Sequence, residues 1–92
     1  MVTAFVLINS QPQRTAALAA ELAEVPGVAE VYSVAGDADL VAIVRCRHHD
    51  DLAEVVTGGI AALEGIVATR TMVAFRSYSQ RDLDAMWSIG LE

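Results

Sequence analysis

The sequence contains no lysine, a single cysteine and few aromatic side chains in its 92 residues. Its six arginines are scattered along the chain and are outnumbered by twelve acidic residues, which gives a net charge of -6 at pH 7. A protein that binds DNA or RNA through its backbone needs clustered Lys and Arg to displace counterions. We therefore expect no direct binding to nucleic acid.

Further absences narrow the class of protein. Cys46 has no partner for an internal disulfide, and one cysteine cannot form a cysteine-rich metal site. Apolar runs such as residues 40–44 are far shorter than the roughly 18 residues that span a membrane. Residues 1–9 lack the basic segment and cleavage site of a secretory leader. These features predict a cytoplasmic protein with no membrane contact, no metal site and no cofactor.

The chain is nevertheless apolar for its size. Hydrophobic residues make up 54% of the sequence, and the mean hydropathy is +0.43. A domain this small often gains stability by oligomerisation. The high content of hydrophobic residues therefore predicts that apolar surface is buried against another protein chain.

Two halves of the sequence repeat one pattern at a shift of 38 residues. Each half reads as a strand, an apolar helical stripe, a break containing glycine and a second strand. The expected strands are residues 2–9, 28–35, 39–47 and 66–76. The first helix follows a cap at Ser10 or Gln11 and stops at Pro26-Gly27, and the second runs from Asp50 or Asp51 to Leu63. This order predicts an α+β, ferredoxin-like β-α-β-β-α-β fold, with an antiparallel four-stranded sheet and both helices on one face.

The expected strands are apolar on both faces. In the first, Val6 and Ile8 alternate with Phe5 and Leu7, so neither face of the sheet is polar. Two helices on one face leave the other apolar face uncovered. We therefore predict that two copies associate through their sheets.

The remaining residues form a tail. We expect a domain over residues 1–78 and a helical tail over 79–92, because Ser79 and Asp82 have the spacing of a capping box before a short helix through Met86. Trp87 and Ile89 would dock on their own domain or on a neighbouring subunit.

The candidate site lies at the expected hairpin Gly36-Asp37-Ala38-Asp39. The carboxylates of Asp37 and Asp39 lie between two apolar strands. Thr69 and Thr71 share one face of the last expected strand. An amino acid needs an acceptor for its ammonium group and donors for its carboxylate. These groups would supply both, with Asp39 as the ammonium acceptor and Asp37 as a turn residue. Gly-Asp turns and strand threonines are also common without any site.

Two other motifs have simpler explanations. His48-His49 precede Asp50-Asp51, but neighbouring residues point in different directions and make a poor chelate. Gly58-Gly59 lies inside the expected second helix, where a kink or close packing against the sheet explains it.

The order of motifs resembles the ligand-binding (RAM) domain of the Lrp/AsnC transcriptional regulators. The stretches that carry the resemblance are VPGV (residues 25–28), GDADL (36–40) and LEGIVATRT (63–71), and the match extends over residues 2–76. It implies dimers formed through the sheets, further assembly into octameric or similar rings, and a small effector, typically an amino acid, bound near the hairpin at a subunit junction. The implied effector-binding residues are Gly36, Asp37, Ala38, Asp39, Thr69 and Thr71.

The chain departs from the family in two ways. Members usually carry a helix-turn-helix ahead of this domain, whereas this sequence starts at the first strand, so it resembles a stand-alone form. Many relatives also have an aromatic residue where Ala38 stands.

Three functions remain open. The first is an effector-binding regulatory module without catalysis. The second is a structural module that co-assembles with full-length regulators of the same family. The third is a small monooxygenase-type enzyme of the dimeric α+β-barrel class, with His48 or His49 as the catalytic candidate, which the apolar helix stripes disfavour. The ACT domain shares the topology, but its ligand loop usually carries a glycine that NSQPQ (residues 9–13) lacks.

Overall fold

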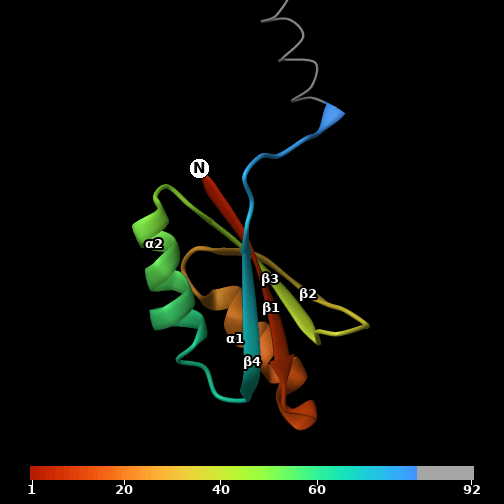
Figure 1. Cartoon of the computed structure of the whole chain (residues 1–92). Helices are drawn as coiled ribbons and strands as arrows, with labels where there is room; N and C mark the ends of the chain where they lie inside the picture. Colours follow the sequence, from red (N-terminus) through yellow and green to blue (C-terminus); the bar gives the residue numbers. More distant parts are fainter. Residues whose placement is uncertain (81–92) are drawn as a thin grey trace, which may run out of the picture.

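The computed structural model describes residues 1–80, which form one sheet with two helices against it (Figure 1). The predicted β-α-β-β-α-β order is confirmed. The elements are β1 (Val2–Ser10), a 3-10 turn η1 (Pro12–Arg14), α1 (Thr15–Glu24), β2 (Val28–Ser33), β3 (Leu40–Cys46), α2 (His49–Glu54), a π-helical turn η2 (Val55–Ile60) and β4 (Ile66–Val73).

The sheet is antiparallel throughout, with the strand order β2-β3-β1-β4. The first strand therefore lies inside the sheet, and β2 and β4 form its two edges. In the register of the central pair, Val6 lies opposite Ala42 on β3. On the other side of β1, Val6 lies opposite Thr71 of β4.

The core follows from alternation along the strands. Ala4, Val6 and Ile8 of β1 are fully buried, whereas the residues between them are half-buried. The buried set packs against Leu18 and Leu22 of α1 and against the second helical segment. Both helices therefore cover the same face of the sheet, as predicted.

We call the opposite surface of the sheet the bare face. It carries six large side chains from all four strands, and no helix among residues 1–80 covers it. Its members are Phe5, Leu7, Tyr32, Val41, Ile43 and Met72. Tyr32 and Met72 are 50% and 54% exposed. Residues 1–80 thus leave this largely apolar sheet face without a covering layer.

The second helix differs from the prediction of one continuous helix. It is α-helical to Glu54 and then widens into η2, which contains Gly58 and Gly59. A Cβ built on Gly59 would lie 2.7 Å from Cγ1 of Val25, and one built on Gly27 would lie 2.6 Å from Cγ2 of Val55. Gly59 is therefore closely packed, but against Val25 at the end of α1 and not against the sheet as predicted, whereas a Cβ on Gly58 would meet nothing within 4 Å.

The predicted start of the first helical segment is confirmed in position, because Gln11 occupies the N-cap before Pro12, although its side chain makes no capping bond. The other candidate, Ser10, instead bonds through its hydroxyl to that of Thr15 at 2.7 Å.

The start of the second helix is corrected. His48 precedes α2, also without a side-chain capping bond. Asp50 and Asp51 lie in the first turn, where a carboxylate favours the helix dipole without capping it.

Beyond β4 the chain leaves the sheet as an extended segment (blue in Figure 1). Phe75 and Tyr78 in this segment are exposed. The predicted short helix through Met86, together with Trp87 and Ile89, lies outside the described residues.

The glycine packing yields a stability prediction. Replacing Gly59 by Ala should lower the free energy of unfolding by about 1–3 kcal/mol, because the new methyl group overpacks against the stiff Val25 side chain. The matched change Gly58→Ala should raise it by about 0.4–1 kcal/mol, because the unfolded chain loses freedom and no contact is strained. Urea unfolding at one fixed protein concentration measures both. Equal effects of the two substitutions would contradict the packing explanation.

Candidate functional site

The predicted hairpin joins β2 to β3 and is closed by a backbone hydrogen bond from Val34 N to Asp39 O, 3.0 Å long. Gly36 has a φ of +129°, a conformation that glycine adopts at no steric cost. Nothing lies within 4 Å of a Cβ built there, so the turn requires glycine for its backbone and not for space. Ala38 is 5% exposed and so packs inward from the turn.

Asp39 connects this hairpin to the end of β1. Its Oδ2 accepts a hydrogen bond of 2.8 Å from Ser10 N, and its own backbone N donates one of 2.9 Å to Ile8 O. The ladder between β1 and β4 shifts register between Asn9 and Ser10. The carboxylate therefore supplies the acceptor for a backbone N–H at this irregular point, which is a structural role that the sequence analysis did not assign.

Asn9 makes a second connection. Its side-chain Nδ2 donates to the backbone carbonyl of Asp37 at 2.7 Å, and Asp37 itself is exposed. Sequence reasoning missed Asn9 and Ser10 as partners of the hairpin. The signal was a polar Asn-Ser pair at the end of an apolar strand, but its partners lie 28 and 29 residues away.

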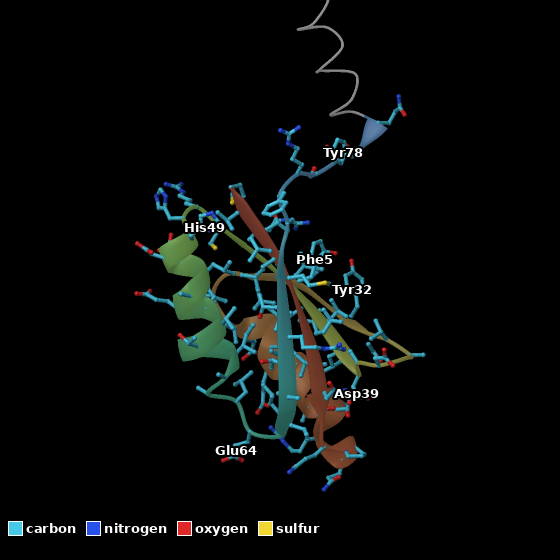
Figure 2. The ribbon with its side chains drawn as sticks, in the orientation of Figure 1. Phe5, Tyr32, Asp39, His49, Glu64 and Tyr78 are labelled. Carbon is cyan, nitrogen blue, oxygen red and sulfur yellow. The ribbon has the colours of Figure 1, made fainter. Side chains whose placement is uncertain are left out.

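The two threonines lie apart from the hairpin. Thr69 pairs with Ile8 and Thr71 with Val6, so both occupy the helix side of the edge strand β4, where they are exposed. Between β4 and β3 lies β1, which places the two strands about 10 Å apart. The structure thus brings Gly36, Asp37, Ala38 and Asp39 together and leaves Thr69 and Thr71 on the far side of β1 (Figure 2 labels Asp39).

A surface cavity lies elsewhere, beside the second helical segment. It measures about 350 Å³ and is lined by none of the predicted site residues. Its walls come from the Val25-Pro26 turn, from Asp51 and Glu54 of α2, and from η2. This cavity is therefore separate from the predicted site.

His48 and His49, the catalytic candidates of the enzyme hypothesis, are both exposed at the start of α2. The His48 carbonyl accepts backbone hydrogen bonds from Asp51 and Leu52, so this segment serves to begin the helix. No group of three or more metal-binding side chains occurs within residues 1–80. Nor does this part of the chain contain a helix long and apolar enough to span a bilayer.

Two ionisable groups with displaced pKa values lie on the bare face. The Tyr32 hydroxyl donates a hydrogen bond to the Glu30 carboxylate, which lowers the pKa of Glu30 and raises the pKa of Tyr32. Arg45 Nη1 also contacts Glu30 Oε1, at 3.4 Å, and lowers the pKa of Glu30 further. Both contacts therefore favour the charged form of Glu30.

Comparison with known proteins identifies the domain. Residues 3–84 match the family model of the Lrp/AsnC ligand-binding domain. A relative, an HTH-type transcriptional regulator (PH1916) of Pyrococcus horikoshii, is 37% identical over 78 residues, which are 79% of this chain and 51% of that protein. This chain thus spans about half the length of the curated relatives it matches. Those relatives are transcriptional regulators and not enzymes, as the sequence predicted.

Solved structures agree with this result. The TTHA0845 protein of Thermus thermophilus is 52% identical, with a TM-score of 0.82 over 87% of this chain and 100% of that one. The transcriptional regulator NMB0573 of Neisseria meningitidis, solved as a complex with L-Met, shares the fold at 12% identity, with a TM-score of 0.76 over 86% of this chain and 53% of that one. The family model covers nearly the whole sequence, and the β-α-β-β-α-β sheet is that of the solved relatives. The chain therefore belongs to the Lrp/AsnC family, and its residues 3–84 are a ligand-binding domain of that family.

Proposed function

We propose that this domain is an effector-binding and oligomerisation module of the Lrp/AsnC type, which acts in the cytoplasm. Its effector is a small molecule, an amino acid, and the domain spans residues 1–78. The lack of lysine and the net charge of -6 support a role that does not involve direct contact with DNA.

The observation that carries this proposal is the position of Asp39. Its carboxylate lies at the mouth of a hairpin held by two side-chain hydrogen bonds to β1, and the bond to Ser10 uses one of its two oxygens. The second oxygen is left to accept from an ammonium group. Backbone N–H groups of the Gly36 turn would donate hydrogen bonds to the carboxylate of the same amino acid.

The threonines extend the site only if more than one copy takes part. Thr69 and Thr71 lie about two strand spacings from the hairpin of their own chain, so a ligand as small as an amino acid does not bridge the two groups. We place the effector at a junction where the hairpin of one copy meets the β4 edge of another. A structural neighbour solved with L-Met makes amino acids the first ligand class to test.

Oligomerisation would connect binding to regulation. An effector that contacts two copies has a higher affinity for the assembled state than for the separated one, and so it shifts the equilibrium between them. The first assembly step in this proposal is a dimer formed through the bare face, where Tyr32 and Met72 are exposed and Phe5, Leu7 and Val41 are half-buried. Rings and mixed assemblies with full-length regulators would be built from that dimer.

One observation favours a second function, co-assembly with full-length regulators without any effector. Ala38 is small and buried at the position where the family resemblance predicts an aromatic wall. A site without that wall would hold a ligand less firmly, and the module would then act through its interfaces alone.

Effector binding is tested by thermal unfolding with each of the twenty amino acids. A ligand at 100 times its dissociation constant stabilises the folded state by about 2.7 kcal/mol, so a few amino acids should raise the melting temperature. Stabilisation by none of them would favour the co-assembly function.

The role of Asp39 is tested by Asp39→Asn, which removes the charge but keeps an oxygen to accept from Ser10 N. This variant should lose the amino-acid shift and keep its unliganded melting temperature within a few degrees. The matched control Asp37→Asn makes the same charge change two residues away and should keep the shift. Retention of the full shift by Asp39→Asn would remove this carboxylate from the site.

Association through the bare face is tested by Leu7→Glu, which places a charge among the apolar side chains of that face. Light scattering should show a dimer or larger species for the wild type at micromolar concentration and a monomer for this variant. The control Ala17→Glu adds the same charge at an exposed position of α1 and should remain associated. If Leu7→Glu associates as strongly as the control, the interface lies elsewhere.

A further inference from the structure

The cavity beside the second helical segment takes no part in the proposed function. Its volume of about 350 Å³ lies within the range of about 300–1,000 Å³ that is typical of pockets for small molecules. One wall is the Val25-Pro26 turn that follows α1, and the other is formed by α2 and η2. The cavity belongs to the helical layer, on the opposite side of the sheet from the bare face. A dimer formed through the bare face would therefore leave it accessible.

Two close contacts fix the shape of this cavity. A Cβ built on Gly59 would lie 2.7 Å from Cγ1 of Val25, and one built on Gly27 would lie 2.6 Å from Cγ2 of Val55. The turn after α1 is thus packed directly against η2, and neither contact leaves room for a larger side chain. The two valines, with the rigid ring of Pro26, give the cavity an apolar wall.

Gly58 keeps the cavity open. A Cβ built at this position would meet nothing within 4 Å, and Gly58 is not among the glycines with a positive φ. Neither packing nor backbone conformation therefore requires a glycine here, although glycine is destabilising in a helical turn relative to alanine. Because Gly58 lines the cavity, a larger side chain at this position would occupy it. The residue lies in the π-helical turn η2, and such turns are frequent at functional sites.

Two carboxylates line the α2 side of the cavity. Asp51 and Glu54 are three residues apart on one helix, so they lie on the same face and repel each other. Neither side chain makes a hydrogen bond or an ion pair with any residue in the described range 1–80. A cation between them would relieve this repulsion, and the apolar wall opposite would contact a hydrocarbon chain. No copy of this chain can supply a lysine side chain for the purpose, because the sequence contains none.

We propose that the cavity binds a small aliphatic amine. The ammonium group lies between Asp51 and Glu54, and the hydrocarbon chain lies against Val25, Pro26 and Val55. A free amino acid fits less well, because its carboxylate would lie beside the same two negative charges. The amine site is separate from the hairpin, and it depends on neither the effector nor the dimer of the proposed function.

The experiment is a titration of the whole chain with pentylamine, followed in amide NMR spectra. Saturable shifts should appear in residues 25–28 and 51–59 and not in the hairpin. Pentanol has the same hydrocarbon chain without the charge and should bind about tenfold more weakly, because it loses both charge contacts. Norvaline, an amino acid with five carbons, should produce no shifts around the cavity.

Variants of the lining residues locate the ligand. Asp51→Asn and Glu54→Gln should each weaken pentylamine binding about threefold, and the double variant about tenfold. The matched control Asp50→Asn removes the same charge from the neighbouring residue of α2, which does not line the cavity, and should retain the wild-type affinity. Gly58→Leu fills the cavity and should abolish the saturable shifts while the rest of the amide spectrum stays in place.

The outcomes decide the proposal without reference to the effector or the dimer. Saturable shifts around the cavity that are lost in the lining variants support the amine site. Shifts that spread over the acidic surface without saturating, or equal affinities for pentylamine and pentanol, overturn it. Equal effects of Asp50→Asn and Asp51→Asn overturn it as well, because the ammonium group would then not lie in the cavity. None of these results alters the amino-acid panel or the association test of Leu7→Glu.

Discussion

The structure depends on one constraint, which is that two helices cover one face of a sheet whose strands are apolar on both. The fully buried residues of β1 and β3 all point toward α1 and the second helical segment. The residues between them meet no covering element among residues 1–80, and large side chains such as Tyr32 and Met72 stay half-exposed. Burial of that surface by a second copy would remove it from contact with water.

The hairpin that carries the candidate site is fixed by the same sheet. Asp39 and Asn9 connect it to the irregular end of β1, where the ladder to β4 shifts register. In this arrangement Oδ2 of Asp39 accepts a hydrogen bond from Ser10 N, and the other carboxylate oxygen is available to a ligand. In the function we propose, a site built on these contacts is shaped within one chain and completed by another, so that a small ligand would influence assembly.

The order of elements and the core were predictable from the sequence because they depend on local periodicity. The alternation of side chains along β1 and the apolar spacing along the helices indicated which residues point into the core. Gly27 marked the end of the first helical segment. The widening of the second helix at η2 was not predictable, because it depends on the fit of Gly59 against Val25, which is distant in sequence. Ser10 proved not to be the cap for a related reason, since it bonds to Thr15 and Asp39 instead.

The candidate site was predicted only in part. The hairpin residues are neighbours in sequence and therefore also in space. The threonines were joined to them without knowledge of the strand order, and the structure places β1 between the two groups. Asn9 and Ser10 were overlooked because their contacts to Asp37 and Asp39 arise from strand pairing and not from spacing along the chain.

The most direct measurement of the central claim is isotope-filtered NMR on an equimolar mixture of labelled and unlabelled chains. Burial of the bare face by a second copy predicts intermolecular NOEs that involve the side chains of Phe5, Leu7, Val41 and Ile43. If these side chains show intramolecular NOEs alone, and the protein tumbles as a monomer of 9.8 kDa, the account is contradicted.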